Sequence, residues 1–402
     1  LNLALLSCIM AIGVNIEWGY AGLFSTGIVG SVALGGLAVA LISSKPVPEG
    51  WAAGGPRILG ALLFAAAAIA LAVWLYRRLN AGTNRALALP LYLVVVFFIY
   101  RAILDPAVVA VEANNPAQAG NIGGLGLNSL LAWPVGALMA AAAAWVIGKI
   151  ALGLREDYLA IATLGIAEII VTVMRNEDWL ARGVKNLTGL PRPWPVPREV
   201  DLQLNPAFLE PVQAMGLDPV TASTIFVKLL YATMFGLVLV LLVWGCERAL
   251  NSPWGRMVRA IRDNEISSAA MGKDVKFRHL QIFIIGSAVV GLAGAMMTSM
   301  EGQLTPPSYL PLRFTFLIWV MVIVGGSGNN WGSILGGLLI GWLYLAVEFL
   351  GPQMMDVITA GLPAGDLKDH LQDTAAQMRL LTLGVVLLLV LRFAPKGLIP
   401  EK

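Results

Sequence analysis

Three stretches of the sequence place polar or small residues inside apolar surroundings, where they could bind a polar solute or a partner. The first, Gly19–Gly27, puts three glycines and two hydroxyl residues inside the apolar run from Leu1 to Leu41. A helix broken there would expose amides of its second half, and such amides at mid-depth in a bilayer bind carboxylates. A tight turn between two apolar spans would give the same pattern, so both interpretations stay open. The candidate residues are Gly19, Tyr20, Gly22, Ser25 and Gly27.

The second stretch is a helix expected after Arg155–Asp157, whose acidic residues suit a helix N-terminus. One face of this helix is small or polar while the rest is mostly apolar. An ionised carboxylate at lipid depth is costly unless it is paired or hydrated, so Glu168 and Thr172 are functional candidates. A packing seam with Glu168 hydrogen-bonded to a neighbour would explain the same face. The face comprises Tyr158, Ala162, Gly165, Glu168, Thr172 and Arg175.

The third stretch, Gly255–Gly272, repeats arginines at helical spacing and offers Val258, Ile261 and Ile266 to an apolar face. We expect a short surface helix that ends in a turn at Gly272. Anionic lipid headgroups would explain the arginines, but the acids and small residues between them favour a protein partner. The residues assigned to this contact are Arg259, Arg262, Asp263, Glu265, Ala270 and Gly272.

Several other kinds of chemistry lack the residues they need. Two cysteines lie in apolar runs and two histidines stand apart, which argues against disulfide frameworks, zinc sites and Cys/His catalysis. The sequence has no Gly-x-x-x-x-Gly-Lys-Ser/Thr loop for ATP and no carboxylate pair at a useful spacing. A net charge of +3 is too small for a nucleic-acid surface. We therefore expect no enzyme, no metal or cofactor in this chain and no nucleic-acid partner.

Composition and hydropathy give the fold class. Of the 402 residues, 58% are apolar and 13% are charged, about half the usual ~25% charged share. We expect an all-α fold, a polytopic transmembrane helical bundle with about eleven spans, some short or broken. Because the chain opens with Leu1 rather than Met, we also expect a segment to precede it. The expected spans are 1–18, 24–43, 57–76, 88–104, 127–149, 158–174, 222–248, 279–300, 314–326, 331–349 and 380–392.

The distribution of basic residues predicts which side of the membrane each loop faces. Lys and Arg collect in the connections 77–85 and 249–278 and in the tail after Arg392, which we place in the cytoplasm. Simple alternation of eleven spans puts all three on one side. The same alternation places outside the Pro-rich loop 175–221, whose Pro191–Pro197 part cannot be helical. The other outer loops are 105–126 and 350–379.

The three stretches occur in an order that resembles LivM-type permeases, subunits of ABC importers for branched-chain amino acids and related solutes. Arg259–Ile266 is similar to the coupling loop of that family. The other matching motifs are Gly19-Tyr20-x-Gly22-x-x-Ser25-x-Gly27, Asp157–Gly165 leading to Glu168, Gly325-Gly326-x-Gly328-x-x-Trp331-Gly332, and the tail Arg392–Leu398. The resemblance adds Gly325, Gly326 and Gly328 to Glu168, Thr172 and the first stretch as translocation-path candidates.

The resemblance implies a single permease domain over 1–402 in a bacterial inner membrane, with 249–278 as its cytoplasmic coupling loop. It implies as partners a second, LivH-type permease, two cytoplasmic ATPase subunits that bind ATP and Mg, a periplasmic solute-binding protein and membrane lipid. Three features depart from the family. Ile28 stands where members place a histidine, Ala269 replaces a second acid, and 50–126, with two extra spans, has no clear counterpart.

The residues also allow a function of another class. Moving a solute against a roughly thousandfold gradient needs about 4 kcal/mol, and an ion gradient could supply it. An ion-coupled secondary carrier would use Glu168 or Glu17 as its proton-binding group. The two functions differ in whether transport requires ATP and ATPase subunits.

Overall fold

The structure is a computed structural model that describes residues 1–79, 83–114, 120–360, 365–374 and 378–401. Within these residues, eight helices are long and apolar enough to cross a membrane, and three shorter apolar helices accompany them. Each expected span coincides with one of these helices, which confirms a polytopic helical membrane protein.

The eight long helices include one that continues as a π-helix, η1. They are α1 with η1 (Asn2–Val14, Asn15–Gly19), α3 (Pro48–Arg78), α4 (Thr83–Glu112), α5 (Ser129–Ala151), α6 (Glu156–Asn176), α10 (Pro219–Leu250), α13 (Val275–Glu301) and α15 (Asn330–Thr359). The shorter apolar helices are α2 (Ile28–Ser43), η4 with α14 (Leu312–Phe316, Leu317–Gly325) and α17 (Met378–Phe393).

Short elements connect the spans. They are α7 (Asp178–Ala181), η2 (Gly183–Lys185), β1 (Leu187–Thr188), α8 (Glu199–Gln203), α9 (Pro206–Ala214), α11 (Pro253–Asp263), α12 (Glu265–Ala270), β2 (Gln303–Leu304), η3 (Pro306–Ser308) and α16 (Asp366–Asp373). The Pro191–Pro197 part of the expected outer loop is non-helical as predicted, although α7, α8 and α9 lie elsewhere in 175–221.

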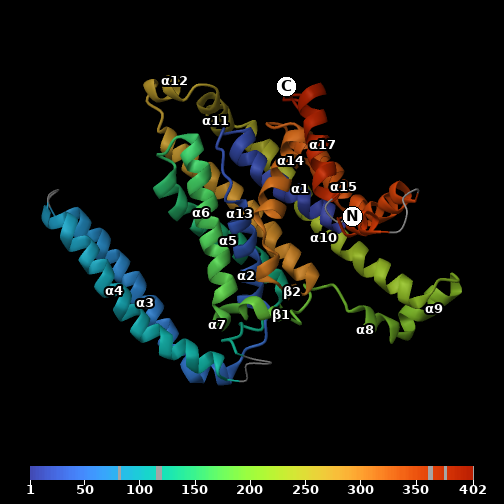
Figure 1. Ribbon diagram of the computed structural model, residues 1–402, viewed down its shortest axis with the longest axis horizontal. Coiled ribbons are helices and arrows are strands. Elements are labelled where there is room, and N and C mark those ends of the chain that lie inside the picture. The colour runs from blue at the N-terminus through green and yellow to red at the C-terminus, as the bar shows by residue number, and fades with distance from the viewer. Residues whose placement is uncertain (80–82, 115–119, 361–364, 375–377, 402) are drawn as a thin grey trace.

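The two ends of the bundle carry different loops. Figure 1 shows α11, α12 and the C-terminus at one end, and α7 with the antiparallel pair β1–β2 at the other. The connection 249–278 and the tail therefore lie together, as the charge distribution predicts. The third basic connection, 77–85, falls partly outside the described residues.

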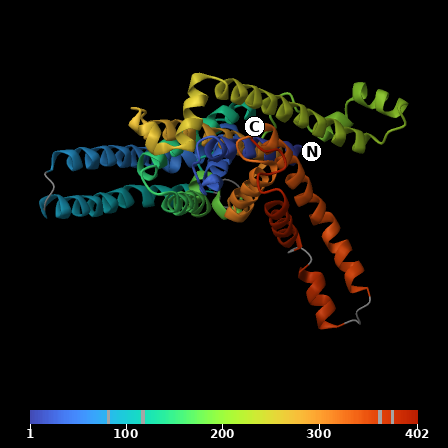
Figure 2. The same ribbon diagram turned by 90° about the horizontal axis from the view of Figure 1, so that it is seen from above.

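Two central helices are enclosed by the others. In α1–η1 and in α13, 72% of the most apolar stretch is buried, against 28% or less in the other long spans of the described chain. α13 packs against α1, α2 and α5. By contrast, α3 and α4 pair with each other and project away from the bundle as a hairpin (Figures 1 and 2).

Small residues allow the central helices to approach closely. A Cβ added to Gly294 of α13 would collide with the backbone oxygen of Val32 in α2, and one added to Gly35 would meet the oxygen of Gly291. The hydrophobic effect does not favour association of transmembrane helices within lipid. Van der Waals contacts between closely spaced backbones stabilise the association instead. The contact between α2 and α13 holds the core of the bundle.

We expect Gly294→Val to destabilise the bundle. The added side chain would collide with Val32, and overpacking costs about 1–3 kcal/mol, so the thermal midpoint in detergent should fall. The matched control is Gly236→Val on α10, where an added Cβ meets no atom within 4 Å in the described structure. Size-exclusion chromatography after stepwise heating measures both. Equal midpoints for the two variants would contradict this account of the core.

Candidate functional site

Arg262 of α11 joins three distant parts of the chain. Its Nη1 donates to the backbone oxygen of Gly19 and lies 2.9 Å from Glu401 Oε2, and its Nη2 lies 3.2 Å from Asp263 Oδ1. Gly22 adopts φ +71° and packs against the stem of this side chain. Partial burial lowers the pKa of Arg262, but Glu401 and Asp263 outweigh it and hold that pKa above its usual value. The arginine is therefore a permanent charge within a cluster of loops.

Asn330 is the centre of a second set of hydrogen bonds beside Arg262. Its Oδ1 accepts from Tyr20 OH at 2.8 Å and from Asn15 Nδ2 at 3.4 Å, while its Nδ2 donates to Glu247 Oε1 at 3.0 Å. Asn15 Oδ1 in turn accepts from the Gly328 amide at 2.8 Å. These bonds tie the end of the first helix to α10 and to the start of α15.

The tail packs against the glycine turn that follows α14. The amides of Leu398 and Ile399 donate to the backbone oxygens of Val324 and Gly325, each at 2.9 Å. Gly326 has φ +114°, and a Cβ there would collide with Ile399. Glycine is therefore required both by the backbone angle and by the space that the tail fills. We call the whole cluster the Arg262 junction; it comprises Gly19, Tyr20, Gly22, Arg262, Gly325, Gly326, Gly328, Asn330 and Glu401.

The rest of the first stretch contacts α6 and α14 instead. Thr26 Oγ1 donates to Ala160 O at 2.6 Å, and the Thr26 amide donates to Thr163 Oγ1 at 3.1 Å. Trp319 Nε1 donates to Ser25 O at 3.0 Å. A turn at Tyr20 and Ala21 is followed by Gly22–Gly27, which have no regular secondary structure and connect η1 with α2.

The amino end of α2 has partners within the chain. The Val29 amide donates to Thr315 Oγ1 at 3.2 Å, and the Gly30 amide donates to Gly27 O at 3.1 Å. Thr315 also donates to the backbone oxygen of Thr26 at 3.3 Å. The helix is broken as one interpretation of the sequence required, but these two first-turn amides serve the protein's own packing.

The small and polar face of α6 lies on the surface of the described chain. Tyr158, Gly165 and Thr172 are exposed, and Glu168 is 45% exposed at its side chain, with Oε1 3.7 Å from Nη1 of Arg175 on the same helix. An adjacent face of α6 packs inward instead, through Leu159, Ala160, Thr163, Ala167, Val171 and Met174. Glu168 and Thr172 therefore lie apart from the Arg262 junction, on a face that this chain leaves uncovered.

The coupling stretch forms two helices where the sequence predicted one. Asn264 adopts φ −156°, ends α11, and accepts from the Ser267 amide at 2.8 Å as the cap of α12. The break changes the apolar face: Val258 and Ile261 are buried, but Ile266 is 84% exposed. Including Ile266 in a face with the other two was therefore wrong.

The remaining residues assigned to this stretch divide between the two helices. Arg259 Nη2 donates to Leu250 O at 3.2 Å and so fastens α11 to the end of α10. Gly272 forms the predicted turn with φ +78°. Met271 is 79% exposed beside it. The surface that α12 and the turn after it present outward comprises Glu265, Ile266, Ala270, Met271 and Gly272.

Sequence reasoning missed several residues that hold these clusters. Asn330 and Glu247 form the second network, Glu401 pairs with Arg262, and Thr163 and Thr315 hold the segment Gly22–Gly27 by hydrogen bonds. Thr163 lies inside the recognised Asp157–Gly165 motif and Asn330 lies beside Trp331, so their positions offered a signal. The others had none, since their partners are far away in sequence.

The chain matches a known family over most of its length. A family model described as branched-chain amino acid transport system / permease component matches residues 107–391. The chain belongs to this family. The match begins within α4, so α1, α2 and α3 lie before it. The apolar helices of the structure agree with this membership, because they are those of an integral, multi-pass membrane protein.

Individual relatives show which permeases the chain is similar to. The chain is 30% identical over 225 residues to the high-affinity branched-chain amino acid permease LivM of Escherichia coli, covering 54% of this chain and 50% of the relative. It is 32% identical over 162 residues to a probable LivM of Methanocaldococcus jannaschii, covering 39% and 42%. The ribose import permease RbsC of Haemophilus influenzae is 27% identical over 104 residues, covering 25% and 32%.

The matches to individual relatives cover only part of each protein. The chain spans about half the length, or less, of the curated relatives it matches. No solved structure gives a significant match. The family match and the LivM relatives confirm the resemblance to a LivM-type permease that the motifs indicated.

We expect Arg262→Gln to reduce solute uptake by roughly tenfold or more, since hydrogen bonds to charged groups contribute about 1.5–3 kcal/mol each. The variant leaves Glu401 and the Gly19 oxygen without their cation. Arg256→Gln is the matched control, because Arg256 lies on the same helix and donates to Asn251 O on the surface. Uptake of a labelled branched-chain amino acid, the solute class in the description of the matching family, by cells that express each variant measures both. Equal loss in both variants would show that only surface charge matters.

We expect Glu168→Gln to leave uptake unchanged from about pH 5.5 to 8, because glutamine preserves the size of the side chain and one acceptor oxygen while removing its charge and its proton exchange. A proton-binding role would instead slow uptake and shift its pH dependence. Thr172→Val on the same face serves as a packing control. Initial uptake rates across the pH range decide between the two roles.

Proposed function

We propose that this chain is the permease subunit of an ABC importer that moves branched-chain amino acids, or related small solutes, across the bacterial inner membrane. The Arg262 junction is the observation that carries the proposal. A helix pair on the cytoplasmic surface holds, through one guanidinium, the point where the first transmembrane helix is broken. A displacement of α11 must therefore act on the transmembrane bundle.

The energy for import comes from other subunits in this proposal. The sequence lacks the usual phosphate-binding loop for ATP, so ATP and Mg bind to two cytoplasmic ATPase subunits. Their closure pushes α11 and α12 and switches the permease between outward-open and inward-open states. The role of this chain is to transmit that movement and to line part of the path.

The exposed face of α6 supports a second permease subunit. Tyr158, Gly165, Glu168 and Thr172 would face hydrocarbon in a lone chain, which is costly for the carboxylate. A LivH-type partner packed against this face would enclose a polar path between the two subunits. A periplasmic binding protein would deliver the solute to the opposite end from the Arg262 junction, where the loop 175–221 lies (Figure 1).

The ATPase contact is supported by the exposed surface of α12. Ile266 and Met271 are among the most exposed apolar residues of the described chain, at 84% and 79%. They lie at the end of the molecule that carries α11 and the tail (Figure 1). Exposed apolar residues rimmed by polar ones mark protein interaction sites, and Glu265 supplies an adjacent charge.

An ion-coupled carrier has one observation in its favour. Glu17 is 4% exposed, accepts from Ser287 Oγ at 2.9 Å, and borders a cavity of about 10 Å³ together with Ser25 and Thr163. That volume holds about one water, so a proton could exchange there. Uptake by liposomes that contain the complete importer, with and without ATP, separates the two functions; uptake without ATP would favour the carrier.

We expect Ile266→Asp to abolish co-purification of the ATPase. Burying an isoleucine side chain contributes about 1.5–3 kcal/mol, and an aspartate there would also lose its hydration. Leu204→Asp is the matched control, because Leu204 is 75% exposed in the expected outer loop. Affinity purification followed by quantification of the bound ATPase measures the effect. Undiminished ATPase with Ile266→Asp would place the docking surface elsewhere.

A further inference from the structure

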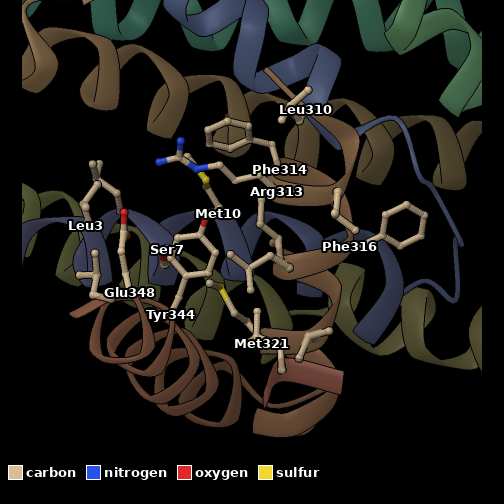
Figure 3. Close-up of a pocket in the computed structure, with 18 of the residues that line it drawn as sticks. Leu3, Ser7, Met10, Leu310, Arg313, Phe314, Phe316, Met321, Tyr344 and Glu348 are labelled. Carbon is tan, nitrogen blue, oxygen red and sulfur yellow. The ribbon is translucent and has the colours of Figure 1, made fainter. Parts of the chain in front are cut away.

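A large cavity lies between α1, η4, α14, α15 and α17, apart from the α6 face. Its volume is about 780 Å³, within the range of sites for small molecules and cofactors. Figure 3 shows Ser7 and Met10 of α1, Phe314 and Met321 of η4 and α14, and Tyr344 of α15 around it. Neither the motifs nor the proposed transport path account for this space.

The charged residues of the lining gather at one end of the cavity. η4 follows β2 and η3 at the end of the bundle opposite the Arg262 junction, and Ser308, Arg313 and Glu348 line the cavity near that end. Most of the other lining residues are apolar, among them Met10 and Met321. From Leu312 to Met321 the lining extends about 14 Å along the helix axis. The cavity therefore combines a charged mouth near the outer boundary with a lining that is otherwise mostly apolar.

The mouth carries charges of both signs. Figure 3 shows the guanidinium of Arg313 and the carboxylate of Glu348 at the same end of the cavity. Arg313 lies over the ring of Phe314, 5.0 Å from its centroid, a contact that uses none of its five N–H donors. Glu301 interacts electrostatically with the same arginine. One cation and one carboxylate at the same end of the cavity suit a ligand head with a negative group and a positive one.

We propose that this cavity holds a phospholipid whose head carries a primary ammonium, with the phosphate bound by Arg313 and the ammonium by Glu348. One acyl chain lies against the apolar part of the lining. A free amino acid has matching charges, but a cavity of about 780 Å³ is far larger than its side chain fills. Hydrocarbon from the surrounding bilayer satisfies both the volume and the apolar lining.

The position of this lipid connects it with the rest of the bundle. Three of the helices that line the cavity also reach the Arg262 junction: α1 continues through η1 to Gly19, α14 ends at Gly325, and α15 begins at Asn330. A lipid between their outer halves keeps them apart at one end while the junction holds them at the other. The lipid is thus a structural part of the permease and not its cargo.

For the test, the protein is reconstituted into liposomes that contain equal amounts of phosphatidylethanolamine and phosphatidylglycerol. It is then extracted and purified in mild detergent. Lipid retained per protein is measured by extraction and mass spectrometry. Gly384 lines the cavity, and a Cβ there meets no atom within 4 Å in the described structure, so Gly384→Leu places a side chain in the cavity without a backbone clash. Gly245→Leu on α10 is the matched control, since an added Cβ is equally free there.

We expect the wild type and Gly245→Leu to retain phosphatidylethanolamine in preference to phosphatidylglycerol, and Gly384→Leu to retain roughly tenfold less. Loss of one charge-assisted hydrogen bond to the headgroup should reduce the preference for phosphatidylethanolamine over phosphatidylglycerol about tenfold. Glu348→Gln keeps the size of an exposed side chain and removes its charge. This variant should therefore still retain phospholipid but should no longer prefer phosphatidylethanolamine. Arg313→Gln should reduce retention of both lipids.

Two outcomes would overturn the proposal. Identical lipid retention in the wild type, Gly384→Leu and Glu348→Gln would mean that only non-specific boundary lipid is present. Binding of labelled leucine that displaces the lipid in the wild type and disappears in Gly384→Leu would make the cavity a solute site. Neither readout uses the ATPase or measures transport, so a failed lipid assignment leaves the proposed function untouched, and the reverse also holds.

Discussion

The architecture at the end of the bundle that carries α11, α12 and the tail depends on how one partly buried cation is neutralised. Arg262 has a side chain only 23% exposed, and a charge removed from water needs partners with good geometry. It finds them in the Gly19 oxygen, Asp263 and Glu401, which belong to three separate segments. The first helix must end there, the loop must bend there and the tail must return there. The glycine turn before α15 follows from the same constraint, because the returning tail leaves no space for side chains.

This constraint explains how a surface contact can reach the membrane. Val258 and Ile261 bury one side of α11 in the protein, whereas α12 faces outward beyond the cap at Asn264. A partner that moves α12 would therefore also move the adjoining helix α11 and, with it, Arg262. Packed interfaces switch between discrete arrangements more readily than they deform. The broken end of the first helix, bonded to Arg262 and to Asn330, is the element that such a switch would reposition.

The sequence predicted what is local and missed what is long-range. Every span was recognised because a helix across lipid needs about twenty apolar residues whatever its neighbours are. The turn at Gly272 and the breaks around Gly19 were visible because glycine marks unusual backbone angles. The pairing of Glu401 with Arg262 was not visible, since nothing in hydropathy links residues 139 positions apart. The exposure of Ile266 was also missed, because helical periodicity was carried across a break that only the Asn264 cap creates.

The surfaces that remain uncovered differ in a way that indicates what covers them. The α3–α4 hairpin exposes large apolar side chains such as Leu63, Ile69 and Phe98, which hydrocarbon solvates without cost. The exposed face of α6 carries Glu168 and Thr172, which hydrocarbon does not solvate. The exposed face of α6 therefore requires water or another protein. In the proposed importer, a polar path between two permease subunits would meet that requirement, because one side of the path would be built from a face that a single chain leaves open.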